Sequence, residues 1–307
     1  MSAQSDASQS QRYRVPVDGG ELAVARWGSA GPTVMAAHGI TASLQSWALV
    51  GEAVAGDLTL LVPDLRGRGE SGRVPGPYGI VQHADDLAAV LDHAGVDDAV
   101  VAGHSMGGAV AAAFAVRYPQ RTRAVLLIDG GAALGQRLPD DIDVDAALEQ
   151  VIGPALARLR QRFASPEEYR AFWHAHPAFV DTDTNMAALD AYADYDLIGS
   201  DGEYRSKASL EAVHADARDM LINDDVREAV AAITAPTVLL LAERGMFNDE
   251  TPLYSDDAVS GLRTQSGPVQ VVRVPATNHY TLALNEHGVL AIAHHLRQLA
   301  SGDQRDA

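Results

Sequence analysis

The chain of 307 residues contains no cysteine, a single lysine (Lys207) and no cluster of basic side chains. The lack of cysteine excludes disulfides, a cysteine nucleophile and thiolate metal sites, although it leaves the cellular compartment open. Acidic residues number 41 against 23 basic ones, which gives a formal net charge of −18. Such a balance argues against nucleic acid or an anionic membrane as the partner.

Long apolar runs are also missing. The longest one, Ala109 to Val116, is far shorter than the roughly 20 residues that a bilayer-spanning helix needs. The first dozen residues, Met1 to Arg12, are polar and lack the apolar region of a secretion signal. We therefore expect no membrane association, a cytoplasmic location and flexible tails at residues 1–12 and 301–307.

Short apolar segments alternate with segments of helical period along most of the chain. Strands are expected at residues 13–17, 21–27, 33–37, 58–62, 100–102, 124–128, 236–241 and 269–274, and helices at 47–55, 80–93, 252–263 and 286–299, with one more directly after residue 105. The central strands are apolar throughout instead of alternating with polar residues. This pattern predicts an α/β fold with a mostly parallel central sheet flanked by helices.

The alternation breaks off after the sixth expected strand. Residues 134–226 show helical patterns, no convincing strand and a high density of aromatic side chains. Helices inserted between two sheet strands have to lie over the carboxyl edge of the sheet, where ligands bind in open α/β sheets. The sequence therefore predicts a core of residues 13–133 and 227–300 and a helical cap of residues 134–226. An exposed aromatic cap could also pair with a copy of itself in a homo-oligomer.

One serine stands where a strand is expected to turn sharply into a helix. The segment Gly103-His104-Ser105-Met106-Gly107 joins an apolar run to a helix of small residues. Such a turn holds its serine in a strained backbone geometry, and side chains at the two glycine positions would collide with neighbouring elements. The Met106 N–H has no partner within the helix and can stabilise a developing oxyanion. Ser105 is therefore the candidate nucleophile.

A serine hydroxyl needs an adjacent base, usually an imidazole oriented by a carboxylate. The last expected strand runs into Asn278-His279, which places His279 at the same sheet edge as Ser105. His38 is interpreted as a hydrogen-bonding residue of its own turn, and His104 as a neighbour of the nucleophile. His279 is the candidate base.

These motifs together resemble the α/β-hydrolase superfamily over nearly the whole stretch from Tyr13 to Leu299. The resemblance rests on four segments in the family's order: His38-Gly39, Asp64 to Ser71, Gly103-x-Ser105-x-Gly107 and Asn278-His279. By position it implies that Ser105 is the nucleophile and His279 the general base. It also implies an oxyanion hole formed by the N–H groups of Ile40 and Met106.

The acidic member of the triad departs from the commonest family pattern. Gly245 stands where an aspartate usually follows the seventh strand. Asp129 follows the sixth strand instead, which resembles the alternative acid position of some haloalkane dehalogenases and fungal lactone hydrolases. Asp129 is thus the preferred acid, and it could alternatively cap the turn that follows it. The alternatives for the acid are Glu243, Asp249 and Glu250.

The resemblance implies two-step acyl transfer on a small hydrophobic ester or lactone, with the aromatic cap resembling lactonases that act on zearalenone-type macrolactones. Two other classes share such folds, namely cofactor-free lyases or oxygenases that use the His–Asp pair and ligand sensors with slow turnover. No metal or organic cofactor is expected. The segment Asp181 to Asn185 imitates a calcium loop, but Met186 stands where that loop needs glycine.

Overall fold

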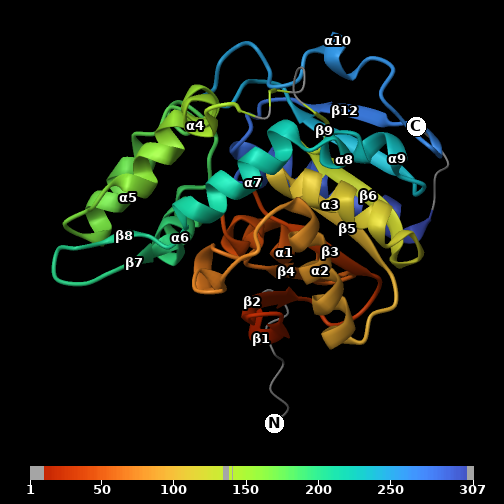
Figure 1. Ribbon diagram of the computed structural model, residues 1–307, viewed down its shortest axis with the longest axis horizontal. Helices are drawn as coiled ribbons and strands as arrows, with labels where there is room; N and C mark the ends of the chain where they lie inside the picture. The colour runs from red at the N-terminus through yellow and green to blue at the C-terminus, as the bar shows by residue number, and fades with distance from the viewer. Residues whose placement is uncertain (1–9, 134–137, 140, 303–307) are drawn as a thin grey trace.

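The computed structural model describes residues 10–133, 138, 139 and 141–302. Eight strands form one sheet in the order β1-β2-β4-β3-β5-β6-β9-β12 (Figure 1). These strands are β1 (Gln11–Val17), β2 (Gly20–Trp27), β3 (Thr33–Ala37), β4 (Thr59–Pro63), β5 (Ala99–His104), β6 (Thr122–Ile128), β9 (Thr237–Ala242) and β12 (Gln270–Val274). Strand β2 pairs antiparallel with β1 and β4, and all other neighbours are parallel. The predicted fold class is confirmed.

Helices cover both faces of this sheet. The buried residues of α2 (Ile80–Ala94), α3 (Met106–Arg117) and α9 (Ala229–Ala232) pack with Val101 of β5 on one face. Those of α1 (Ala48–Val54) and α11 (Glu286–Ser301) pack with Val100 and Ala102 on the other. Because β5 is buried on both sides, its sequence is apolar without alternation.

A helical region is inserted between β6 and β9. It contains α4 (Val144–Arg160), α5 (Pro166–His174), α6 (Met186–Asp196), α7 (Leu210–Ile222) and α8 (Asp224–Arg227). Helices α4, α5 and α6 gather to one side of the sheet (Figure 1). The prediction of no strand in this region needs a correction, because the two-residue strands β7 (Leu197–Ile198) and β8 (Arg205–Ser206) pair there. These strands are too short to show a period in the sequence.

Aromatic side chains form the core of this inserted region. Phe163, Tyr169, Trp173, Phe179 and Tyr192 are buried in one cluster, separate from the two cores of the sheet. Trp173 lies at its centre, with ring centroids 5.4 Å from Tyr192 and 6.0 Å from Phe179. Most of the aromatic density seen in the sequence therefore serves to pack the inserted helices.

The bounds of one expected helix and of the expected terminal tails differ from those in the structure. The helix expected at residues 252–263 is reduced to α10 (Asp256–Val259), because Gly261 takes a left-handed φ of 79° and the chain continues into the short strands β10 (Arg263–Thr264) and β11 (Gly267–Pro268). Strand β1 begins at Gln11, inside the expected tail of residues 1–12, and α11 ends at Ser301. The remaining tail residues, 1–9 and 303–307, lie outside the described residues, as do residues 134–137 and 140 of the predicted cap. Over the described ranges, no helix is both long enough and apolar enough to cross a membrane.

The carboxyl ends of four parallel strands meet at one edge of the sheet. Strand β3 ends before His38, β5 before Ser105, β6 before Asp129 and β12 before the loop that carries His279. The candidate residues are therefore collected at this edge from segments far apart in the sequence.

Candidate active site

Ser105 lies at the apex of the turn between β5 and α3. Its backbone angles are φ 58° and ψ −124°, a conformation that side-chain-bearing residues rarely adopt. A Cβ at Gly103 would come within 1.8 Å of the Gly107 carbonyl oxygen, and a Cβ at Gly107 within 2.1 Å of the Ala37 carbonyl oxygen. Both distances are far below contact, so the two glycines are needed for this turn to pack against β3.

His279 and Asp129 form a buried hydrogen-bonded pair. The Nδ1 of His279 lies 2.7 Å from Oδ2 of Asp129, although the two residues are 150 positions apart in the sequence. Their exposed fractions are 4% and 1%. The other oxygen of Asp129 accepts a hydrogen bond from the Ala242 N–H at 3.2 Å. Because an ionised carboxylate only accepts, Nδ1 of His279 carries the proton and its Nε2 is left with a free lone pair.

The three alternative acids lie elsewhere. Glu243 accepts a hydrogen bond from the Ala276 N–H, and Asp249 accepts one from the Phe247 N–H. Glu250 is exposed. Among the four candidate carboxylates, all of them in the described part of the chain, Asp129 contacts His279 and the other three do not.

Ser105 and His279 line the same pocket. Among the described residues, no hydrogen bond joins their side chains. Catalytic hydrogen bonds are often absent or long before substrate binds, and they tighten in the complex.

The turn after β3 lines this pocket, and one of its N–H groups has no acceptor among the described residues. The Gly39 carbonyl oxygen accepts hydrogen bonds from the Ala42 N–H at 3.1 Å and from Nδ1 of His38 at 2.9 Å. In a trans peptide the N–H points opposite to the C=O, so the Ile40 N–H of this peptide faces away from those partners. Across the described residues the Ile40 N–H has no acceptor, and a Cβ at Gly39 would lie 3.7 Å from Oγ of Ser105.

The structural interpretation of His38 agrees with its contacts. Its Nε2 accepts a hydrogen bond from the Leu65 N–H at 3.0 Å, which leaves Nδ1 as the donor to Gly39. Burial lowers the pKa of His38 to about 3, so the ring is neutral at neutral pH and keeps this arrangement there.

The second expected oxyanion donor is the N–H of Met106. Met106 is the first residue of α3, so its N–H has no acceptor within the helix. Ser105, which bears the hydroxyl, is the residue that immediately precedes it. The two expected donors therefore belong to the turn after β3 (Ile40) and to the first residue of α3 (Met106).

His104 has a contact that sequence reasoning missed. Its Nε2 lies 2.8 Å from the carbonyl oxygen of His279, and the two ring centroids are 4.7 Å apart. Burial lowers the pKa of His104 to about 3, so the ring is neutral and Nε2–H donates to that carbonyl. His104 thus supports the backbone of the candidate base.

The pocket itself is small and mainly apolar, with a volume of about 50 Å³. Residues of the inserted region and of the core line it together. Its apolar and aromatic lining includes Ile152, Phe179, Tyr192, Met246, Ala283 and Leu284. Ile152 sits at a kink in α4, where its φ of −131° departs from helical geometry. The sequence could not single out these lining residues, because their spacing also fits packing within the inserted region.

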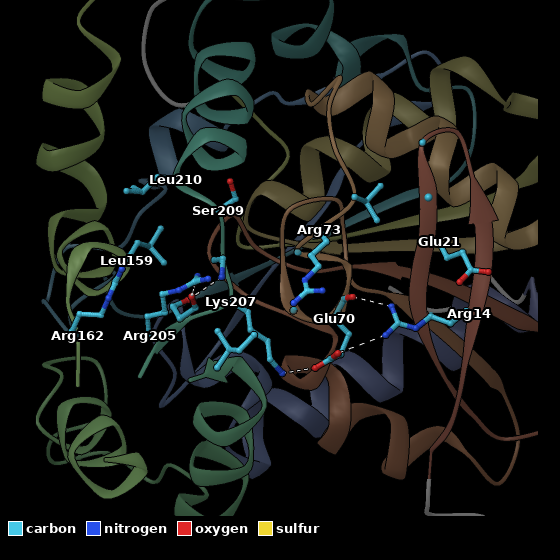
Figure 2. A pocket seen from close by; sticks show the side chains of 18 residues that line it. Arg14, Glu21, Glu70, Arg73, Leu159, Arg162, Arg205, Lys207, Ser209 and Leu210 are labelled. Atoms are coloured by element: carbon cyan, nitrogen blue, oxygen red, sulfur yellow. Dashed lines mark hydrogen bonds and ion pairs between the residues drawn. The ribbon is translucent and has the colours of Figure 1, made fainter. Parts of the chain in front are cut away.

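A second and larger hollow has a volume of about 940 Å³. It is formed by the β1–β2 hairpin, the loop around Glu70 and the inserted region, and Figure 2 shows the side chains that line it. Its two serine side chains have structural roles, since Oγ of Ser209 caps α7 and Oγ of Ser206 donates to Asp196. Its lining contains no histidine. The pocket at Ser105, although smaller, is therefore the candidate active site. In the described ranges no group of three or more potential ligand side chains could hold a metal ion.

The sequence model of the alpha/beta hydrolase fold family matches residues 32–285. With the sheet order and the inserted helices, this match shows that the chain belongs to that family. Lipase LipV of Mycobacterium tuberculosis is 33% identical over 196 residues, which cover 63% of this chain and 69% of LipV.

Solved structures show the same fold. The crystal structure of E-2-(acetamidomethylene)succinate hydrolase superposes with a TM-score of 0.73 at 24% identity, over 95% of this chain and 98% of that one. An esterase of Thermogutta terrifontis superposes with a TM-score of 0.66 at 24% identity, over 94% of this chain and 99% of that one.

Proposed function

We propose that the protein is a serine hydrolase that cleaves carboxylic esters through an acyl-enzyme intermediate. The observation that carries this proposal is the convergence on one pocket of Ser105 in a strained turn, the His279–Asp129 pair and the unpaired Ile40 N–H. The relation to a protein named as a lipase and the fold shared with an esterase support the same reaction class.

The proposed reaction has two halves. Ser105 Oγ attacks the ester carbonyl carbon while its proton passes to Nε2 of His279, and the resulting oxyanion is stabilised by the Ile40 and Met106 N–H groups. The C–O bond to the alcohol breaks as His279 returns the proton to the leaving oxygen. Water then attacks the acyl-enzyme by the same route and releases the acid. Asp129 holds the imidazole in the required tautomer throughout.

The pocket indicates the kind of acyl group. Its apolar lining suits a hydrocarbon chain, and its small volume suits a short one. A hydrophobic lactone is the narrower alternative, favoured by the aromatic side chains of Phe179, Tyr192 and Tyr280 at the pocket. The ring of a zearalenone-like macrolactone is far larger than a short acyl group, so its cleavage would require the inserted helices to move outward. Short aryl esters are therefore the first substrates to test.

The experiment is reaction of the purified protein with a fluorophosphonate, followed by intact mass measurement of the wild type and of Ser105→Ala. One added label in the wild type and none in the variant is the expected result. Hydrolysis of p-nitrophenyl acetate, butyrate and octanoate, and of zearalenone, then ranks the substrates. A folded wild type that takes no label would refute the serine-hydrolase mechanism, and activity that survives in Ser105→Ala would point to chemistry of the His–Asp pair alone.

A further inference from the structure

We propose that Arg158, a residue of the inserted helix α4, positions the turn that carries the Ile40 N–H. This inference rests on the proposed function, because it concerns the oxyanion hole of the same site. Arg158 is not among the residues that line the pocket, whereas Thr41, whose carbonyl oxygen it contacts, is one of them. Arg158 is thus a positioning residue and not a catalytic one.

The guanidinium of Arg158 is fully buried and bonds in two directions. Its Nη1 donates to the Tyr169 hydroxyl at 2.6 Å, to Oγ of Ser206 at 3.1 Å and to the Asp196 carboxylate. Its Nη2 donates to the Thr41 carbonyl oxygen at 2.9 Å. The first three partners belong to the inserted region, from α5, β8 and α6, whereas Thr41 belongs to the core. One side chain therefore joins three inserted elements to the turn after β3.

The turn from residue 39 to 42 depends on such contacts, because each of its first three carbonyl oxygens is held by a different group. The Gly39 oxygen is held by Ala42 and His38, as described above, and the Ile40 oxygen accepts from Nε of Arg68 at 3.0 Å. The Thr41 oxygen is the one held from the inserted region. Fixing the orientation of consecutive peptides fixes the direction of the Ile40 N–H, since the peptides share Cα atoms.

Arginine is the side chain that this position requires. A planar guanidinium donates in several fixed directions at once, so one nitrogen can serve Asp196 while the other serves a carbonyl. The ring of Trp173 lies against the guanidinium carbon at 4.9 Å and holds the plane. A lysine has a single nitrogen on a flexible stem, and its charge would be drawn to Asp196. Arg158→Lys is therefore expected to keep the buried charge pair but to release the Thr41 carbonyl.

The test compares a transition-state analogue with a ground-state analogue in the wild type and in Arg158→Lys. An aryl trifluoromethyl ketone adds the serine hydroxyl and forms an oxyanion, whereas the matching methyl ketone binds without that charge. We expect Arg158→Lys to bind the trifluoromethyl ketone about tenfold or more weakly than the wild type does. Its affinity for the methyl ketone should change by less than about twofold, because only the charged adduct uses the oxyanion hole. The same variant should lower kcat by a similar factor and leave KM within about twofold.

Tyr195→Phe is the matched control. The Tyr195 hydroxyl, on α6, donates to Oδ2 of Asp64 at 2.6 Å, so it also joins the inserted region to the core without touching residues 39–42. We expect this variant to bind both ketones as the wild type does. The proposal would be overturned if both variants changed the affinity for the trifluoromethyl ketone equally, or if Arg158→Lys lost the same affinity for both ketones.

Two further outcomes are separable. If Arg158→Lys does not fold, Tyr169→Phe and Ser206→Ala take its place. Each keeps the Arg158–Asp196 charge pair but removes one hydrogen-bond acceptor of Nη1. We then expect a smaller loss of affinity, for the trifluoromethyl ketone and not for the methyl ketone. No loss in either variant would refute the positioning role. If the wild type and Ser105→Ala bind the trifluoromethyl ketone equally, the proposed serine hydrolase itself fails, independently of Arg158.

Discussion

The substitution Asp129→Asn tests the acid of the proposed triad most directly. Asp129 is 1% exposed and accepts from His279 at 2.7 Å and from the Ala242 N–H at 3.2 Å. Asparagine has the same size, and its amide oxygen can keep one of these bonds. Its NH₂ group, however, turns an acceptor facing Nδ1 of His279 into a donor. The imidazole then places its proton on Nε2, which is the nitrogen that must accept the proton of Ser105.

The expected loss follows from that change of tautomer. Replacing the triad aspartate by asparagine in serine proteases lowers kcat by about 10⁴ while leaving the geometry intact. At about 1.4 kcal/mol for each factor of ten, the barrier rises by about 5.5 kcal/mol. We expect a loss of this size in ester hydrolysis and a parallel slowing of fluorophosphonate labelling, both measured at one pH on protein whose thermal unfolding is also recorded.

Asp249→Asn is the matched control, because it makes the same chemical change at a carboxylate that does not contact His279. Its labelling rate should stay within about twofold of the wild type, as expected of a surface substitution. If Asp129→Asn keeps more than a tenth of the wild-type rate, or if Asp249→Asn is the slow variant, the assignment of the acid is wrong while the proposed nucleophile stands.

Two other predictions concern stability. Gly103→Ala would place a methyl group 1.8 Å from the Gly107 carbonyl oxygen. We therefore expect the variant to be less stable by about 3 kcal/mol or more and to unfold at a markedly lower urea concentration. An unfolding midpoint equal to that of the wild type would contradict the geometry of the turn. Burial raises the pKa of Asp64 from 3.8 to about 6, so the folded protein binds this proton more tightly than the unfolded chain does. The stabilising contribution of this proton is present below pH 4 and is lost as the pH rises through 6. Asp64→Asn has no such proton. We therefore expect the free energy of unfolding of the wild type, compared with that of Asp64→Asn, to fall by about 2 to 3 kcal/mol between pH 4 and pH 7. A constant difference across that range, measured by urea titration, would show that Asp64 does not titrate in this way.

The sequence by itself was sufficient for the fold, and it placed two of the candidate site residues, Ser105 and His279, at the same edge of the sheet. Strands buried on both faces have to be apolar throughout, and this is why β5 and its neighbours could be predicted as a parallel sheet. The turn at Ser105 could also be predicted, because its strained backbone demands glycine on both sides within a few residues. His279 followed from its place after the last strand. All of these signals are local or periodic, so they are readable along the chain.

The tertiary structure decided what depends on contacts between distant segments. Four carboxylates were compatible with the sequence as the acid, and among these four Asp129, 150 positions from His279, is the one whose side chain lies within hydrogen-bond distance of it. The hydrogen bond of His104 and the proposed role of Arg158 likewise depend on the backbone carbonyl oxygens of His279 and Thr41. Every residue has such an oxygen, so the sequence does not show which of them a distant side chain contacts. The lining of the pocket depends on how the inserted helices lie over the sheet. Such contacts form only when the chain has folded. Neither the spacing nor the composition of the residues shows which distant segments pack against each other.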